Sequence, residues 1–366
     1  MEPLFEDIMK QFNVEGDFIK AELINSGHIN DTYFVSFRKK DNKVQKYTLQ
    51  RINHYVFKEP DRLMNNIIKV TNHIREKVKN ENGNPKRETL TFIPALNGKY
   101  FYKTPQGDYW RVYSYIENAV TYQKVEDSKH FYSAGKAFGK FQMYLNDFSA
   151  KDLHETIPDF HNTPKRLKAL IESIDTDSVN RAIAVKPEID FVMKRAEQAD
   201  LIVNLLNEGS IPLRVTHNDT KFNNVLIDIN TGDGICVIDL DTVMPGSSLY
   251  DYGDSIRSGA NTADEDEPDL SKVWLDIGLF ENFTRGYFEM MHNLLKPKEI
   301  EYLPFSSILI TLELGMRFLM DYINGDTYFK VHREGHNLDR ARVQFKLVAD
   351  MEKKYDKMKN IVDKYK

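Results

Sequence analysis

The stretch LRVTHNDTKFNNVLID, residues 213–228, decides how the rest of the chain is interpreted. It leads from an apolar, strand-like segment into a polar loop and back into an apolar segment. The next residues, INTGDGICVIDLD at 229–241, contain a Gly-rich turn and a second apolar run that ends in Asp239 and Asp241. Two apolar runs around such a turn predict a β-hairpin. Because a hairpin brings its outer ends together, we expect the polar loop and the two carboxylates to lie side by side.

The polar side chains of this hairpin have the spacing His217-x-Asp219-x₄-Asn224, with Asp239 at the end of the second strand. Carboxylate and amide oxygens are ligands that Mg²⁺ accepts, together with water and substrate phosphates. The spacing is typical of kinase-like phosphotransferases, in which Asp219 would be the catalytic base and Asn224 and Asp239 would hold the metal. A polar turn with exposed caps is the alternative for either half alone. The two halves together favour phosphoryl transfer.

The chain has 366 residues, which exceeds the size at which one hydrophobic core usually stops growing, so we expect two lobes. Runs rich in Tyr, Phe, Val and Thr predict a β-rich lobe over residues 1–117, with about five strands and a helix at 61–79. Apolar residues then recur at the helical period through residues 118–366. Helices are predicted at 127–148, 164–174, 189–206, 272–294, 304–323 and 338–362. The predicted fold class is α+β.

Charge and cysteine content exclude several classes of function. The net charge is −5 and the basic residues are spread along the chain, so we expect no nucleic-acid partner. The single cysteine, Cys236, cannot form an intramolecular disulfide and lies in an apolar run, which is typical of a reducing compartment. The acidic N-terminus lacks the pattern of a signal peptide, and no run approaches the ~20 apolar residues of a membrane span. We expect a cytoplasmic protein without a membrane partner, either a monomer or a weak homodimer.

Longer strings along the chain add to this pattern: GHINDTY at 27–33, WRVYSYIE at 110–117, IPLRVTHNDTK at 211–221, VIDLDTVMPGSSLYDYGDSIR at 237–257, GMRFLMDYINGD at 315–326 and EGHN at 334–337. Together they resemble the aminoglycoside phosphotransferase and choline kinase superfamily. The resemblance is greatest to the bacterial N-acetylhexosamine 1-kinases and runs nearly end to end. It implies a two-lobed protein-kinase-like fold, use of ATP and Mg²⁺, and transfer of phosphate to the anomeric hydroxyl of N-acetylglucosamine or N-acetylgalactosamine.

The resemblance implies structural roles for two residues near the hairpin. His217 would brace the catalytic loop, and Asp251 would hold the backbone of that loop, although a helix cap is a closely related alternative. Asp241 would lie either behind the metal ligands or on the surface.

Nucleotide contacts are implied in the N-terminal lobe. His28, Asn30 and Thr32 would donate to phosphates from a loop with one glycine, unless this loop is an ordinary hairpin turn. The basic residue that the superfamily uses on the following strand is replaced by Gln50. Arg51 stands beside it, but alternation directs these two side chains to opposite faces.

The connection between the lobes would bind the adenine ring. Tyr115 and Ile116 lie where a kinase-like hinge offers backbone groups to the base, although strand packing explains their apolar character equally well.

Acceptor contacts are implied in the helical lobe. The resemblance makes Arg317, Tyr328, His336 and Asn337 candidates for sugar binding, facing the catalytic Asp219. Arg317 is a charge in an otherwise apolar helix, where such residues are usually paired or snorkelling. The acidic run at 264–269 could line a pocket for a cation, but a solvated loop is the favoured interpretation.

Two alternatives to a hexosamine kinase remain. One is a kinase of another small-molecule hydroxyl, such as choline, an aminoglycoside, homoserine or a different sugar. The other is a catalytically weak nucleotide-binding module, which Gln50 and the single-glycine loop would suit.

Overall fold

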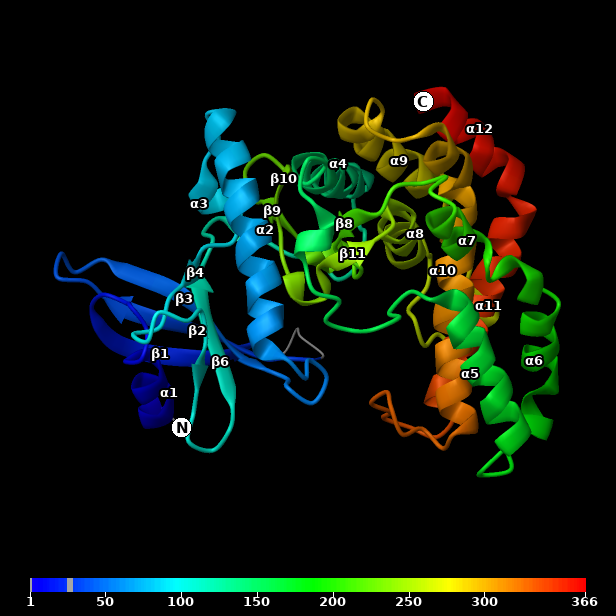
Figure 1. Cartoon of the computed structure of the whole chain (residues 1–366), viewed down its shortest axis with the longest axis horizontal. Helices are drawn as coiled ribbons and strands as arrows, with labels where there is room; N and C mark the ends of the chain where they lie inside the picture. Colours follow the sequence, from blue (N-terminus) through cyan, green and yellow to red (C-terminus); the bar gives the residue numbers. More distant parts are fainter. Residues whose placement is uncertain (1, 25–28) are drawn as a thin grey trace.

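An antiparallel β-sheet forms the N-terminal lobe of the computed structural model, which describes residues 2–24 and 29–366 (Figure 1). Its strands lie in the order β1-β2-β3-β6-β4, and β5 pairs with β6, so the sheet has six strands where we expected about five. Aromatic and β-branched side chains dominate the strands because they pack well on a pleated surface. The strands are β1 (Asp17–Ile24), β2 (Asp31–Arg38), β3 (Val44–Ile52), β4 (Phe92–Ile93), β5 (Tyr102–Lys103) and β6 (Tyr109–Ser114).

Helices cover the two faces of this sheet. One face packs on α1 (Glu2–Met9), whose Phe5 and Met9 join a buried cluster with Leu49 and Trp110 of the sheet. The other face packs on α2 (Pro60–Asn80), which confirms the helix predicted at 61–79. A short helix, α3 (Pro85–Glu88), follows it.

Helix α2 is also hydrogen bonded to the C-terminal lobe. The Asn66 side chain donates to His154 O at 2.7 Å and to Val243 O at 3.0 Å, and it accepts from His154 N at 2.9 Å. Lys69 Nζ donates to Asp152 O at 2.8 Å. Side chains of α2 and of the helical lobe therefore form one continuous core between the lobes.

The C-terminal lobe is mostly helical, as predicted, and its helices differ from the prediction in several places. The segment predicted as one helix at 189–206 is broken into α6 and α7, and the segment at 338–362 is broken at Lys354 into α11 and α12. Helix α8 was not among the predicted helices, and α10 begins at residue 297, before the predicted start at 304. The helices are α4 (Ser128–Tyr144), α5 (Thr163–Thr176), α6 (Lys186–Met193), α7 (Leu201–Asn207), α8 (Ser248–Gly259), α9 (Ile277–Met291), α10 (Pro297–Ile323), α11 (His336–Lys353) and α12 (Tyr355–Tyr365).

Helix α10 begins early because its first turn is well anchored. Pro297 occupies the start of the helix, where no backbone donor is required, and Glu299 Oε2 accepts from Lys296 N at 2.8 Å. Arg214 Nε donates to Glu299 Oε1 at 2.7 Å, so the first turn is tied to the strand that precedes the catalytic loop. Pro304 lies inside the helix and does not start it.

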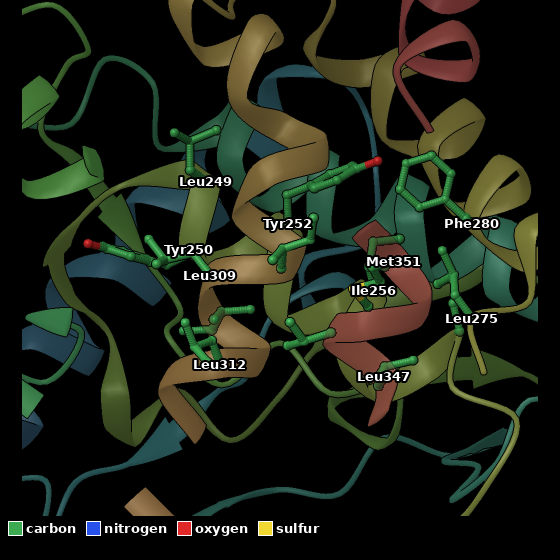
Figure 2. Close-up of a cluster of buried hydrophobic side chains, with 14 of the residues drawn as sticks. Leu249, Tyr250, Tyr252, Ile256, Leu275, Phe280, Leu309, Leu312, Leu347 and Met351 are labelled. Atoms are coloured by element: carbon green, nitrogen blue, oxygen red, sulfur yellow. The ribbon is translucent and has the colours of Figure 1, made fainter. Parts of the chain in front are cut away.

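Contrary to expectation, one helix in the described part of the chain has the length and composition of a membrane span. This is α10, with a mean hydropathy of 1.4 over its most apolar window, but 78% of that window is buried in the fold. Figure 2 shows its Leu309 and Leu312 among side chains of α8 and α11, including Ile256 and Leu347. The core of the helical lobe therefore explains its hydrophobicity.

The predicted hairpin is confirmed. Its strands β9 (Val225–Asp228) and β10 (Gly234–Val237) pair in antiparallel fashion, and β7 (Ala119–Val120) extends the pair from the inter-lobe connection. A second antiparallel pair joins β8 (Arg214–Thr216) to β11 (Met244–Gly246). The two polar loops therefore begin and end on paired strands, which hold them rigidly beside each other.

Candidate active site between the lobes

The predicted catalytic loop, which lies between β8 and β9, is held by one buried carboxylate. Asp251 of α8 accepts hydrogen bonds from the backbone N–H groups of His217 at 2.9 Å and Asn218 at 2.7 Å, and from Gln142 Nε2 at 2.7 Å. Asn218 has a φ of 64°, a left-handed conformation that Asn tolerates better than most residues. The sharp turn at Asn218 is therefore fixed just before Asp219.

The same loop is bonded to the loop that follows β10. The His217 ring packs near Phe138 and Phe141, and its Nε2 lies 2.8 Å from Ile238 O. Thr242 Oγ1 donates to His217 O at 2.6 Å. His217 thus links the two polar loops, as expected of a bracing residue.

Asp219 lies beside a cation and an amide. Lys221 Nζ is 3.0 Å from Asp219 Oδ1, and Asn224 Nδ2 donates to Asp219 O at 2.8 Å and to Oδ2 at 3.3 Å. Burial raises the pKa of Asp219, but Lys221, His217 and Arg257 together lower it by more, so the pKa lies below its ordinary value. Asp219 is therefore ionised at neutral pH and able to accept a proton. We had not predicted a role for Lys221, although its place two residues after Asp219 was a usable signal.

Asp239 lies two residues after β10, with a φ of 59°, and its exposed side chain is in a strongly acidic environment. Desolvation by the surrounding protein, followed by the nearby carboxylates of Asp241 and Asp219, raises the pKa of Asp239 to about 6. Such a cluster is stabilised by a cation. Because Asn224 uses its Nδ2 on Asp219, its carboxamide oxygen is the atom left for a metal.

This donor set fits Mg²⁺ and does not fit a metal held by protein alone. Within residues 2–24 and 29–366, no three carboxylate, imidazole or thiolate groups converge to enclose an ion. Mg²⁺ commonly takes one or two protein oxygens and completes its shell with water and phosphates. Asn224 and Asp239 would be those two protein ligands.

Polar residues of the N-terminal lobe are hydrogen bonded to one another and to Asp241 of the C-terminal lobe. We call this set the inter-lobe network; its members are Asn30, Thr32, Gln50, Arg111 and Asp241. Arg111 Nη1 donates to Asp241 Oδ1 at 2.5 Å, and Asn30 Nδ2 donates to Asp241 Oδ2 at 2.6 Å. Gln50 Oε1 accepts from Arg111 Nε at 3.0 Å and from Nη2 at 2.8 Å, while Gln50 Nε2 donates to Thr32 Oγ1 at 3.0 Å. Asp241 is thus buried and paired. Arg111 was not predicted, and His28 lies outside the described residues.

Arg51 lies on the opposite face from Gln50, as alternation along β3 requires. It pairs with Asp31 and Asp108 and remains half exposed. Gln50 is therefore the member of this pair that faces the C-terminal lobe.

The connection between the lobes follows β6 directly. Tyr115 N donates to Lys46 O at 3.4 Å, and Ile116 is buried. Arg87 Nη2 donates to Glu117 O at 3.1 Å and lies 2.9 Å from Asp228 Oδ2, which ties the connection to β9. Tyr115 and Ile116 therefore lie on a segment anchored in both lobes.

On the acceptor side, α10 carries two charges one turn apart. Glu313 is buried and bonded to His161 Nδ1 at 2.9 Å and to Thr163 Oγ1 at 2.5 Å. His161 Nε2 lies 3.2 Å from Asn218 O, so this pair connects α10 to the residue before Asp219. Arg317 lies over the ring of Phe160, with 5.6 Å between its guanidinium carbon and the ring centroid. His161 and Glu313 were not predicted; Glu313, a charge in an apolar helix, carried the same signal as Arg317.

The remaining acceptor candidates are Tyr328, in the loop between α10 and α11, and His336 and Asn337, at the start of α11. Tyr328 is 69% exposed, whereas His336 and Asn337 are buried. Asn337 Nδ2 donates to Asp321 Oδ2 and to Asp326 Oδ1, each at 2.9 Å, and His336 Nε2 lies 2.9 Å from Asp266 Oδ2. Asp321 also accepts from the backbone N–H groups of residues 327–329. The side chains of His336 and Asn337 are thus bonded within the protein, and Asn337 supports the loop that presents Tyr328.

Replacing Asn337 by Asp should destabilise the protein. The new carboxylate would face Asp321 and Asp326 with no proton to donate, so we expect the free energy of unfolding to fall by about 2–4 kcal/mol. Urea unfolding measures it. The matched control is Asn97→Asp: Asn97 lies in an exposed turn and only accepts, from Lys99 N, which Asp can also do. Equal stability of the two variants would contradict this account of Asn337.

A β-rich lobe, a helical lobe and an Asp–Asn–Asp cluster on a hairpin between them define a kinase-like phosphotransferase. The chain belongs to the phosphotransferase enzyme family (APH), whose model matches residues 20–288. Solved structures of low sequence identity share the whole fold.

Three of these structures illustrate the likeness. An aminoglycoside phosphotransferase from Alicyclobacillus acidocaldarius matches with a TM-score of 0.63 and 10% identity, over 98% of this chain and 96% of that one. A microcompartment-associated aminopropanol kinase matches with a TM-score of 0.55 and 13% identity, over 97% and 98% of the two chains. Spectinomycin phosphotransferase, in complex with ADP and spectinomycin, matches with a TM-score of 0.54 and 12% identity, over 96% and 97%.

Proposed function

We propose that this protein is an N-acetylhexosamine 1-kinase, which uses Mg·ATP to phosphorylate the anomeric hydroxyl of the sugar. The observation that carries phosphoryl transfer is the junction of Asp219, Asn224 and Asp239 on two bonded loops. The choice of an N-acetylhexosamine is supported by the sequence strings that resemble that group of kinases and by the charges on the acceptor side.

The reaction assigns a separate task to each residue. Mg·ATP supplies the phosphoryl group and the positive charge that stabilises its transfer. The oxygen of the acceptor hydroxyl bonds to the γ-phosphorus while the bond between that phosphorus and ADP breaks. Asp219 accepts the proton of the hydroxyl during this step and then releases it to solvent. Lys221 keeps Asp219 ionised before the reaction and contributes a positive charge beside the transferred group. Asn224 and Asp239 would hold the metal.

Two arginines make the acceptor side unsuitable for a cationic substrate. Arg317 lies over the Phe160 ring, and Arg166 Nη2 donates to Phe160 O at 3.1 Å. Burial, followed by the positive charge of Arg317, holds the pKa of Arg166 below its ordinary value, so the two cations already repel each other. A third positive charge from a protonated amine would be unfavourable here. A neutral polyol would not be.

Unpaired polar atoms also support a hydroxyl-rich acceptor. Within the described part of the chain, the buried Arg166 Nε and Tyr250 hydroxyl have no hydrogen-bond partner. The Tyr250 ring stacks on His161, with 5.1 Å between ring centroids. Buried polar atoms are normally satisfied, so these two are suited to sugar hydroxyl or amide groups.

The acidic loop at 264–269 is engaged elsewhere. Asp266 pairs with His336, and Glu265 lies 3.4 Å from Arg257 Nη1. These two carboxylates do not form an open wall for a cation, which further supports a neutral acceptor.

An acceptor panel tests this proposal. We expect ADP release with N-acetylglucosamine or N-acetylgalactosamine to exceed that with choline, homoserine and an aminoglycoside by at least about 100-fold in kcat/KM, because a mismatched polar or charged acceptor leaves buried groups unpaired. Phosphorus NMR should identify a sugar 1-phosphate. Turnover only with amines or other alcohols would overturn the choice of substrate. Binding of Mg·ATP without turnover on any acceptor would indicate the catalytically weak module.

A further inference from the structure

The β3 position that kinase folds use for a phosphate-binding base carries Gln50 in this chain, yet a buried cation lies next to it. In the antiparallel register of β3 and β6, Gln50 is directly opposite Arg111. Directly opposed residues project from the same face of a sheet. Arg111 therefore points toward the C-terminal lobe from the neighbouring strand.

The Arg111 guanidinium is held along one edge by the N-terminal lobe. Its Nε and Nη2 both donate to Gln50 Oε1, and Gln50 is in turn fixed by Thr32 Oγ1. This leaves Nη1 directed at the loop that follows β10. Gln50 thus acts as a positioning residue that directs the other edge of the guanidinium across the lobe boundary.

Arg111 Nη1 donates to a carboxylate in the acidic turn at residues 239–241. Asp241, its partner, is buried and lies two residues beyond the more exposed Asp239, in the turn that follows β10. Arg111 is only 2% exposed. A buried arginine must be paired, and its planar fork binds phosphate oxygens as well as carboxylates.

We propose that Arg111 is the residue of the N-terminal lobe that binds the nucleotide phosphates, and that Asp241 occupies its guanidinium until the nucleotide arrives. The phosphate-binding charge has moved from β3 to the facing position on β6, and Gln50 now orients it. When phosphate oxygens take Nη1, the Asp241 carboxylate retains its hydrogen bond from Asn30 Nδ2. This inference rests on the proposed use of an adenine nucleotide, but not on the identity of the acceptor.

The alternative is an ion pair that only joins the lobes. Such a pair would influence every ligand that needs the lobes together, whether or not the ligand carries phosphate. Comparing adenosine with ADP separates the two roles. A phosphate-binding Arg111 affects only ADP, whereas an ion pair that only joins the lobes affects both ligands.

The test is isothermal titration of the full chain with adenosine and with ADP, in EDTA so that no metal contributes. Arg111→Met should weaken ADP binding by about 10- to 100-fold, the range expected for loss of charge-assisted hydrogen bonds, and leave adenosine binding within about twofold. Arg51→Met is the matched control, since Arg51 is the next residue to Gln50 on β3 but lies on the other face; it should alter neither ligand.

A second pair of variants keeps the test valid if Arg111→Met does not fold. Asp241→Asn should tighten ADP binding several-fold, because Arg111 no longer has to leave a carboxylate. Arg111→Lys, which keeps the charge but loses the fork, should weaken ADP binding several-fold.

Three results would overturn the proposal or its basis. Equal weakening of adenosine and ADP in the Arg111 variants would show an inter-lobe ion pair only. Unchanged ADP binding in these variants would exclude a phosphate contact. Failure of the unaltered protein to bind either ligand would instead remove the adenine nucleotide from the proposed function.

Discussion

Replacing Asp219 by Asn lowers kcat by about 10²–10⁴-fold and leaves the dissociation constant of Mg·ATP nearly unchanged. The amide has the size of the carboxylate but cannot accept the acceptor proton. The loop should keep its shape, because its backbone is held by Asp251 and by Thr242. Steady-state ADP release measures kcat, and calorimetry measures nucleotide binding.

The control for this variant is Asp233→Asn. Asp233 is an exposed residue in the turn of the same hairpin, so the substitution removes one negative charge nearby without touching the site. It should retain full activity. A near-native rate for Asp219→Asn would contradict the assignment of the base.

Replacing Asp239 by Asn has opposite effects on activity and stability. Activity should fall by at least about 100-fold. Of the two proposed metal ligands, Asn224 and Asp239, only Asp239 is a carboxylate, so the variant removes the one negatively charged ligand. The metal-free protein should become more stable at pH 7.5. Desolvation in the site, followed by the neighbouring carboxylates of Asp241 and Asp219, raises the pKa of Asp239 to about 6, so its ionised form is unfavourable in the folded state at neutral pH. Because the side chain is exposed, solvent screens part of this effect, and the gain in stability should be modest.

The stability gain of Asp239→Asn should depend on pH, because only the ionised form of Asp239 destabilises the folded protein. The folded-state pKa is above the unfolded value, so the penalty is complete above pH 6 and disappears as the pH falls through 6 toward 4. Urea unfolding in EDTA should therefore show a measurable stability advantage of Asp239→Asn at pH 7.5 and a smaller one at pH 4.5. Asp175→Asn, at an exposed position on α5, is the control. A variant less stable than the native protein at pH 7.5 would contradict this account.

The catalytic hairpin could be predicted because its chemistry is local. Asp219, Asn224 and Asp239 lie within 21 consecutive residues, and the alternation of apolar and polar residues defines both strands and both loops. The two lobes and most helices could also be predicted, because the periodicity of apolar residues is a local pattern in the sequence.

Long-range partners could not be predicted from such patterns. Arg111 is 61 residues from Gln50 and 130 from Asp241, so its position depends on the strand register and on the packing of the lobes. His161 and Glu313 are separated by 152 residues.

Helix α8 escaped prediction for a different reason. Residues on all its sides are buried, and several are polar, including Asp251 and Ser255, whose hydroxyl donates to Thr220 O at 3.0 Å. An apolar stripe at the helical period is therefore weak in a helix that supports a polar loop.

The hydrogen bonds of α2 determine which parts of the chain can swing as a unit. Although α2 precedes the connection at Tyr115 and Ile116 in sequence, Asn66 and Lys69 bind backbone carbonyls of the helical lobe. A hinge motion that carried all of residues 1–117 would break these bonds and expose the apolar side of α2. Opening that preserves them would have to move the sheet relative to α2, against the apolar packing between the two. The mobile unit would then be smaller than the lobe that the order of the sequence suggests, and the chain would have to bend on both sides of α2, near residues 53–59 and 81–91, as well as at the inter-lobe connection.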